Sequence, residues 1–478
     1  MSREKMTSNS WQRMVLSLCL LSGMNQLSFV AARAGQQGLD QTSHYADQVA
    51  KAAQQLIKLT PADQLEQLQQ PFRSSKRTAG RDTSGTPSFC GVVAWCRSQG
   101  LGQGAMGQAQ LFSLHRLLRQ SLSSGGYQSL LSVLNRQRVI GEMEAVVDPT
   151  AVKRAAELYP EARAHTIQAF PQLARPTLRD WYPSIGGMTP LPDSKLNWSW
   201  NPPGAAIRRE QFDDYALLIS GDPGKGKRWG LRFEGHHLTI NLTFMRDQKG
   251  DFQVAGTPLF LGAFPMVVPA SPSSLRDLQS QWQWTQGQSM LFGAAQELRE
   301  LWQSLPAGDR DQAKIPNDRF DQVSPLLADT PPNYLITALD PRPDPQSIRR
   351  FASIEILPKQ LSKKSLWHLS QAFDVYLSPM HSDVARQYRS RLNTALESNQ
   401  PIQLSWAGGA LADIGSHHYS YLQIGDLLLE LFQSNRFSTQ HESVPSGNHV
   451  HGMLRDLAFD WQQPNPVEKH LLMHHHHH

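Results

Sequence analysis

The segment Trp229–Phe244 alternates apolar and polar residues, and this pattern constrains the fold most strongly. The apolar residues stand at odd positions up to Phe233 and at even positions from Leu238 onward. A β-bulge at Gly235 would explain the change of phase within one long strand, because glycine tolerates the backbone of an inserted residue. The bulge would turn His236 towards the apolar side. It would also gather five side chains on one polar face: Arg232, Glu234, His237, Thr239 and Asn241.

A second β segment is expected near the C-terminal end of the chain. Gly425-Asp426 is a good two-residue hairpin turn between Tyr419–Ile424 and Leu427–Gln433. This turn would pair Tyr421 with Glu430 and His418 with Gln433. His418 and Glu430 would then lie on opposite faces, so at most one of them would join a common site unless a bulge intervenes.

Blocks of helical and strand periodicity alternate along the chain and predict an α+β fold, with helices packed on a mainly antiparallel sheet. We expect a single large domain over residues 35–473. Its parts are a helical segment over 40–145 broken at Gly125-Gly126, an irregular insertion over 148–226, β structure over 227–268, helices over 271–398 and β structure over 402–461. Within the first β part, Phe252–Phe260 is expected to form one strand. Residues 474–478 are interpreted as a histidine tag.

The first 34 residues resemble a secretory signal peptide. Basic residues precede the short apolar run Met14–Leu21, and Ala32-Arg33-Ala34 fits the small-x-small cleavage rule. The apolar run is far shorter than the roughly 20 residues that a membrane-spanning helix needs. We therefore expect a periplasmic or secreted protein with no membrane span in the mature chain.

Export also affects how the cysteines are interpreted. After cleavage only Cys90 and Cys96 would remain, and two cysteines in an exported chain suggest one disulfide that closes a short loop.

The formal net charge of +5 over 478 residues is small and is not gathered in a basic stripe. These features argue against a nucleic-acid partner.

Two short histidine clusters carry most of the chemical information. They are Glu234-Gly235-His236-His237 and Asn448-His449-Val450-His451, the latter followed by Arg455. Imidazole is the commonest protein ligand for transition metals. His449 and His451 would share one face of an extended segment and, with His237, would hold one ion and leave positions open for water or substrate. His236 and His418 are further candidate ligands.

Polar residues around these histidines suggest roles in catalysis. Glu234 is a candidate metal ligand, a candidate partner that orients a ligand, or a candidate general base, and Glu430 is a second candidate catalytic carboxylate. Arg455 could hold an anionic substrate group or pair with Asp456 or Glu430. Asn241, on the same predicted face as Glu234, is a candidate substrate-binding residue.

The aromatic residues of the irregular insertion raise the question of a sugar ligand. Trp198, Trp200 and Tyr182 could stack on a sugar ring, although such residues more often pack the loop down. A small-molecule or carbohydrate-like substrate is the expected partner.

Five segments of this chain resemble an uncharacterised family of exported bacterial and fungal proteins, the domain-of-unknown-function family 3500. In chain order they are Leu122–Glu142 (LSSGGYQSLLSVLNRQRVIGE), Trp229–Leu242 (WGLRFEGHHLTINL), Gly256–Phe264 (GTPLFLGAF), Trp406–Tyr419 (WAGGALADIGSHHY) and Asn448–Asp456 (NHVHGMLRD). The EGHHL and NHxHxxxRD motifs are the most specific of these.

The resemblance implies a set of hallmark residues here: His236, His237, His418, Tyr419, Glu430, His449, His451 and Arg455. It thereby adds Tyr419 as a candidate substrate-binding residue. The family usually shows a compact Glu-Tyr-Asp-Asn-Thr-Gln run before its His-x-His, whereas this chain has an apparent insertion between Gln433 and Gly447. The roles of that Asp and Asn therefore do not carry over. The resemblance brings no established reaction.

These observations favour an exported metal-dependent hydrolase, with zinc as the first choice of ion because hydrolysis needs no redox change. A copper- or iron-dependent oxidoreductase at the same histidines is the first alternative. The second is a non-catalytic metal- or ligand-binding protein of the cell envelope, and the third is a hydrogen-bonded histidine network without metal. No Gly-x-Ser-x-Gly elbow is present, and Gly221–Gly226 lacks the spacing of a phosphate-binding loop.

Overall fold

The computed structural model describes residues 42–74, 77, 100–147, 215–224, 228–235, 237–246, 252–268, 281–315, 354–408, 418–434 and 449–460. In this part of the chain twelve strands form one sheet in the order β1-β3-β4-β5-β7-β12-β11-β10-β9-β8, with β2 beside β3 and β6 beside β5. All pairs are antiparallel except β1 with β3. The predicted α+β class is confirmed.

The sheet joins two antiparallel meanders, one from each half of the chain. The first contains β3 (Ala216–Gly221), β4 (Arg228–Gly235), β5 (Leu238–Arg246), β6 (Phe252–Ala255) and β7 (Leu259–Ala263), with the short β1 (Gln69–Gln70) and β2 (Leu101–Gly102) at its outer side. The second contains β8 (Ile354–Ile356), β9 (Ile402–Gly408), β10 (His418–Ile424), β11 (Leu427–Ser434) and β12 (His449–Asp456). Since β7 pairs with β12, the two halves meet at the centre of the sheet.

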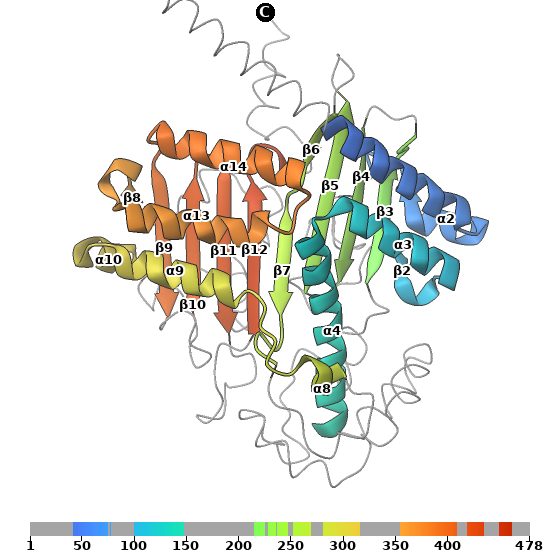
Figure 1. Cartoon of the computed structure of the whole chain (residues 1–478), viewed down its shortest axis with the longest axis horizontal. Helices are drawn as coiled ribbons and strands as arrows, with labels where there is room; N and C mark the ends of the chain where they lie inside the picture. Colours follow the sequence, from blue (N-terminus) through green and yellow to red (C-terminus); the bar gives the residue numbers. More distant parts are fainter. Residues whose placement is uncertain are drawn as a thin grey trace, which may run out of the picture.

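The labelled helices lie on one face of this sheet, which we call the helix face (Figure 1). A helix over residues 42–59 and helices α2 (Ala62–Leu68), α3 (Gln108–Ser121) and α4 (Ser124–Val147) belong to the first half. Helices α9 (Phe292–Ser304), α10 (Ala307–Ala313), α13 (Lys363–Leu377) and α14 (Ser382–Glu397) belong to the second, and the short α8 (Gln281–Thr285) contacts α4. Two 3-10 turns, η2 (Gln103–Ala105) and η9 (Pro358–Gln360), complete the described elements. The main apolar core fills the space between these helices and the sheet.

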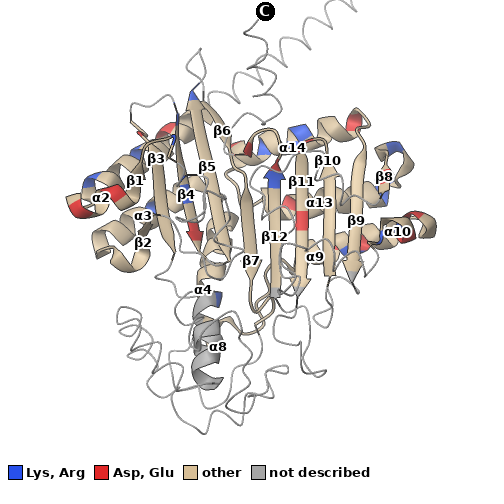
Figure 2. Cartoon of the chain, turned by 180° about the vertical axis from the view of Figure 1, so that it is seen from behind, with Lys and Arg blue, Asp and Glu red and all other residues tan. Residues whose placement is uncertain are grey.

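The opposite face of the sheet is polar and yet buried, and we call it the polar face. Strand alternation separates its residues from the core residues of the helix face, and Figure 2 views the molecule from this side. Its buried polar side chains include Ser220, Arg232, Glu234, Thr239, Asn241, Thr243, Gln403, Ser405, Tyr419, Tyr421, Glu430, His451 and Arg455. Burying a polar group costs free energy unless it is hydrogen-bonded, so this face is the first place to look for function.

The prediction of a β-bulge at Gly235 is wrong. Trp229–Phe244 forms a tight hairpin in which β4 ends at Gly235, β5 begins at Leu238, and these two residues pair. A two-residue turn always pairs odd with even positions, which explains the change of apolar phase without an inserted residue. The expected shared face of Arg232, Glu234, Thr239 and Asn241 is nevertheless confirmed, because Arg232 pairs with Asn241 and Glu234 with Thr239.

The structure corrects four other element boundaries that were predicted from the sequence. The expected strand Phe252–Phe260 is split into β6 and β7, which pair with opposite ends of β5; Pro258, between them, has no N–H to give to a ladder. The end of the expected irregular insertion forms β3, and β8 interrupts the expected helical block. Gly125 and Gly126 lie inside the first turn of α4, because the Ser123 hydroxyl accepts a hydrogen bond from the Gly126 N–H and begins the helix there.

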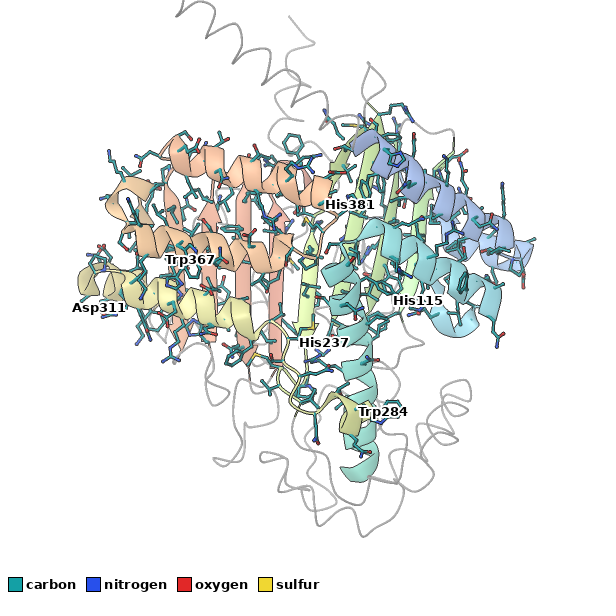
Figure 3. The ribbon with its side chains drawn as sticks, in the orientation of Figure 1. His115, His237, Trp284, Asp311, Trp367 and His381 are labelled. Atoms are coloured by element: carbon teal, nitrogen blue, oxygen red, sulfur yellow. The ribbon has the colours of Figure 1, made fainter. Side chains whose placement is uncertain are left out.

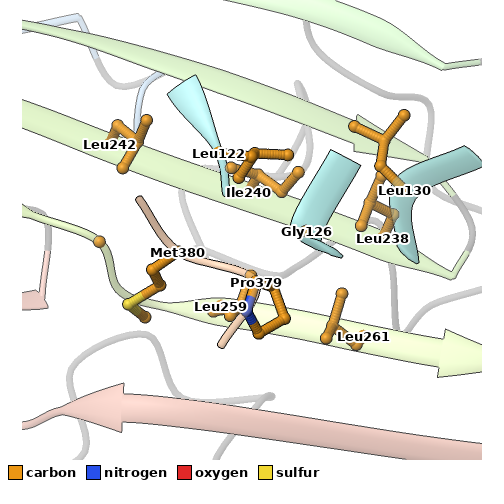
Figure 4. A pocket seen from close by; sticks show the side chains of 11 residues that line it. Leu122, Gly126, Leu130, Leu238, Ile240, Leu242, Leu259, Leu261, Pro379 and Met380 are labelled. Atoms are coloured by element: carbon orange, nitrogen blue, oxygen red, sulfur yellow. The ribbon is translucent and has the colours of Figure 1, made fainter. Parts of the chain in front are cut away.

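The two halves also meet on the helix face, where the α3–α4 turn packs on the α13–α14 turn. The Ser123 N–H donates to the Pro379 carbonyl at 3.1 Å, and the Ser123 hydroxyl donates to the Ser378 carbonyl at 2.6 Å. A small apolar pocket lies beside this contact, between the start of α4 and strands β5 and β7 (Figure 4). This contact holds α4 over the middle of the sheet.

Several expectations concern segments outside the described residues. They are the signal peptide over 1–34, the Cys90–Cys96 disulfide, the aromatic residues Tyr182, Trp198 and Trp200, and the tag. Among the helices that the structure describes, none is long and apolar enough to cross a membrane.

His381 gives the fold a pH-dependent helix cap. Its Nδ1 accepts a hydrogen bond from the Asp383 N–H at 3.4 Å at the start of α14, and its ring stacks on Tyr45 with centroids 3.9 Å apart. Burial lowers the pKa of His381, an effect that the nearby Asp383 carboxylate opposes and Arg386 reinforces. The folded state therefore binds fewer protons than the unfolded chain below the ordinary histidine pKa of about 6.5.

We expect the free energy of unfolding to fall as the pH is lowered from 7 towards 5.5. Protonation of Nδ1 removes the acceptor that caps α14, and the half-buried ring resists the charge. Urea denaturation at both pH values checks this result. His381→Asn keeps a capping acceptor but does not titrate, so its loss of stability over this interval should be smaller than that of the wild type. An equal loss in both proteins would contradict the assignment.

Candidate functional site

His237 and His451 lie side by side on the polar face at the centre of the sheet. Their ring centroids are 5.4 Å apart with an interplanar angle of 55°, and both side chains are buried. His237 comes from the β4–β5 turn of the first half, near the end of β7 (Figure 3), and His451 from β12 of the second half. The pair therefore joins residues from both halves of the fold.

Gly262 of β7 creates the space for this pair. It is opposite His451 in the β7–β12 ladder, and its N–H donates to the His237 carbonyl at 2.8 Å. A Cβ at this position would lie 2.9 Å from Cδ2 of His237 and 3.1 Å from Cδ2 of His451. Both imidazoles thus occupy space that the side chain of any other residue at position 262 would fill. Sequence reasoning missed Gly262, although the segment GTPLFLGAF contains it.

Apolar side chains surround the pair on its own face. Phe260 contacts the His451 ring edge-on with centroids 5.3 Å apart, and Phe432 is the direct cross-strand neighbour of His451 on β11. Phe260, Phe432 and Met453 are buried but stand apart from the main core cluster of the helix face. The histidines therefore sit in an environment of low polarity, where electrostatic interactions are strong.

Glu234 lies on the first half's side of the pair. It forms a buried ion pair with Arg232, and Arg232 also donates to the Arg77 carbonyl at 3.4 Å. The arginine offsets the charge of the carboxylate, which allows both groups to be buried. Asn241, a predicted substrate-binding residue, donates its Nδ2 to the Pro258 carbonyl at 2.8 Å. That bond holds the segment between β6 and β7.

Glu430 lies on the second half's side of the pair. It accepts a hydrogen bond of 2.7 Å from the Tyr419 hydroxyl, and both side chains are fully buried. Burial, and then the charge of Glu430, raise the pKa of Tyr419 well above its ordinary value. Tyr419 therefore keeps its proton and acts as a donor.

Arg455 has a different partner from those expected. Its Nε donates to Asp460 at 2.6 Å, and Asp460 also accepts from the Asp456 N–H at 2.9 Å. Burial raises the pKa of Asp460, while the Arg455 charge opposes this shift. Asp456 belongs to the helix face, where it pairs with Arg391 of α14. Of the two expected partners, Asp456 is excluded because it faces the helices, and Asp460 is a partner that the sequence did not indicate.

His418 does not join the histidine pair. The predicted hairpin register is confirmed, with His418 opposite Gln433 and Tyr421 opposite Glu430, so His418 and Glu430 lie on opposite faces. On the helix face, the His418 Nε2 is 3.0 Å from the Ser420 hydroxyl, and its ring stacks on Trp406. A ligand role for His418 alongside His451 is therefore excluded by strand alternation.

Three of the expected metal ligands have described side chains, and only two of these, His237 and His451, lie together. His236 and the side chain of His449 lie outside the described part, and within it no group of three or more His, Cys, Asp or Glu side chains is placed to hold an ion. β12 begins at His449 and is extended up to Asp456, as the predicted grouping of His449 with His451 requires.

The fold and the site together define a class: an α+β protein whose described helices form one layer on a sheet, and whose opposite, polar sheet face carries a buried histidine pair at its centre. A family model described as "Protein of unknown function (DUF3500)" matches residues 42–463, and the chain belongs to this family. Comparison with curated proteins gives no match. Comparison with solved structures gives none either.

Proposed function

We propose that this protein is an exported metal-dependent hydrolase whose ion is held by His237 and His451, with His449 and His236 as further ligands. The observation that carries the proposal is the approach of the two rings across Gly262. For Zn–N bonds of about 2.1 Å in tetrahedral geometry, two imidazole centroids lie about 5 Å apart. The separation of 5.4 Å fits this value.

The chemistry that a divalent ion supplies here is polarisation of the bond to be broken and a lowered pKa of water, to about 7 in favourable cases. Zinc is the preferred ion because hydrolysis needs no change of oxidation state. We assign to Glu234 the removal of a proton from water and its delivery to the leaving group. Arg232 orients that carboxylate.

The remaining polar groups have positioning roles in this proposal. Arg455, fixed by Asp460, orients a polar group of a small-molecule substrate at the end of β12. Glu430 and Tyr419 lie on the opposite side of His451 from β7 and contact the substrate there. The apolar side chains of Phe260, Phe432 and Met453, which surround the histidine pair, limit the access of bulk water.

Metal analysis of the protein after tag removal tests the proposal, because the terminal histidines themselves bind metals. We expect about one equivalent of zinc in the wild type and loss of most of it in His237→Ala and His451→Ala. His115→Ala is the matched control, since His115 lies on α3 and bonds to the Tyr127 hydroxyl.

A wild type without metal, or equal metal in all these proteins, would contradict the proposal. Copper or iron at the same histidines, with oxygen-dependent turnover, would replace the hydrolase with an oxidoreductase. Bound zinc without hydrolysis of any ester, amide or glycoside substrate would leave a binding protein.

A further inference from the structure

The histidine pair is closed off from solvent in this structure. His237 is 0% exposed and His451 is 5% exposed, so an ion reaches the two rings only when part of the fold opens. The line between β5 and β7, which we call the seam, runs through the pair. His237 immediately precedes β5, whereas Gly262 and His451 lie on the other side of the seam, on β7 and β12. The strength of the seam therefore decides whether the pair can be reached there.

Among the described ladders next to the histidine pair, the one across the seam is the shortest. β7 pairs with β12 over five residues, and β5 pairs with β4 over eight. β5 and β7 pair over two: Leu238 with Leu261, and Thr239 with Phe260. A ladder with few hydrogen bonds opens locally more often than a long one. β7 is thus held more firmly by β12 than by β5.

Packing across the seam is incomplete on the helix face. The small apolar pocket of Figure 4 lies there, and its walls include residues of both strands: Leu238 and Ile240 from β5, and Leu259 and Leu261 from β7. Atoms that line a pocket have no partner atoms on one side, so they lose part of their van der Waals attraction. The pocket therefore weakens the same line that the short ladder leaves weak.

Asn241 forms a latch across the seam on the polar face. It lies on β5, and its Nδ2 donates at 2.8 Å to the carbonyl of Pro258, which immediately precedes β7. The segment before β7 is tied to the second half of the fold as well, because the Gly256 N–H donates to the Tyr388 hydroxyl of α14 at 3.1 Å. The bond from Asn241 must therefore break if β5 is to move away from β7.

We propose that the sheet opens along the seam, that Asn241 holds it closed, and that this opening admits the ion to His237 and His451. When β5 moves away from β7, His237 moves with β5, and His451 stays with β7 and β12. The open form therefore cannot hold one ion between the two rings, and a bound ion holds the seam closed. The inference rests on the proposed function for the ion alone, since the opening itself is measured without metal.

Hydrogen exchange with single-residue resolution, on the tag-free full chain without metal, tests the opening. Two neighbouring amides of β7 serve as a matched pair. The Gly262 N–H donates across the seam to the His237 carbonyl at 2.8 Å. Successive amides of a strand point to opposite neighbours, so the Leu261 N–H points towards β12. After correction for intrinsic rates, we expect the Gly262 amide to exchange about tenfold faster than the Leu261 amide, or more.

Asn241→Leu removes the latch and keeps the approximate size of the side chain. We expect this variant to speed exchange of the Gly262 amide about tenfold, because the closed form loses one hydrogen bond that the open form lacks. Thr243→Val is the matched control. It lies on the same face of β5, two residues further on, where its hydroxyl accepts from Arg77 at 3.3 Å. This variant should leave the ratio of the Gly262 and Leu261 exchange rates unchanged.

Zinc connects the seam to the histidine pair. Because the open form does not hold the ion, zinc at 100 times its dissociation constant should slow exchange of the Gly262 amide about 100-fold. Asn241→Leu should also speed zinc uptake by the metal-free protein about tenfold, since uptake follows the population of the open form. Stopped-flow mixing with a chromogenic chelator measures this rate.

Equal exchange of the Gly262 and Leu261 amides, or an unchanged ratio in Asn241→Leu, would overturn the inference. Zinc uptake at the wild-type rate in Asn241→Leu would overturn it too, because the ion would then enter by another route. Fast exchange of the Gly262 amide in a protein that binds no zinc would support the opening and contradict the proposed function instead.

Discussion

Gly126→Ala is expected to destabilise the protein by about 3 kcal/mol or more, because the new methyl group would meet main-chain atoms that cannot move aside. Its Cβ would lie 1.9 Å from the Pro379 carbonyl oxygen and 2.6 Å from the carbonyl carbon. To relieve this overlap, α4 must withdraw from the α13–α14 turn. The two hydrogen bonds from Ser123 to Ser378 and Pro379 would then lengthen or break. Urea denaturation measures the loss.

The adjacent residue provides a matched control. Among the described residues, a Cβ on Gly125 would meet only the Ser123 hydroxyl, at 3.8 Å, which is ordinary contact. Gly125→Ala should therefore stabilise the protein by about 0.5–1 kcal/mol, since alanine favours a helix more than glycine does. Equal effects of the two substitutions would show that α4 does not pack closely on Pro379.

Gly262→Ala is expected to reduce the affinity for the proposed zinc ion by about 10–100-fold, a loss typical when residues that orient ligands are changed. The methyl group would be 2.9 Å from His237 and 3.1 Å from His451, so at least one ring must turn away from the other. Overpacking should also cost about 1–3 kcal/mol of stability. Competition with a chromogenic chelator measures the affinity, and urea denaturation measures the stability.

Gly293→Ala serves as the control for this substitution. Gly293 lies in α9, and a Cβ there would have no atom of the described residues within 4 Å. The variant should keep the wild-type affinity for the ion. If Gly262→Ala also kept that affinity while losing stability, the histidine pair would be a packing feature and not an ion site.

Local sequence signals predicted the β10–β11 hairpin residue by residue. Gly425 has a φ of 54°, which glycine adopts readily, and a Gly-Asp pair is a strong turn signal. The register follows from the turn alone, and it correctly placed His418 and Glu430 on opposite faces. The β4–β5 hairpin was missed because its turn residues are histidines, which carry no turn signal.

The meeting of His237 with His451 could be proposed from the sequence, but local patterns alone do not establish it. It depends on the pairing of β5 with β7 and of β7 with β12, two strands that lie far apart along the chain. Nothing in local periodicity specifies such contacts. The partner of Arg455 was missed for a related reason: Asp460 lies just beyond β12, in a turn that returns to the strand end.

Gly452 of β12 lets the helix layer approach the sheet closely. A Cβ there would lie 1.5 Å from the Tyr376 hydroxyl of α13, so the buried ring lies directly against the strand backbone. His451 is the next residue and points to the other face. Only one peptide unit therefore separates the contact of Tyr376 with Gly452 on the helix face from His451 on the polar face. α13 also carries Trp367, which is 54% exposed. A displacement of α13 would therefore have to move the backbone at Gly452, and with it the adjacent His451.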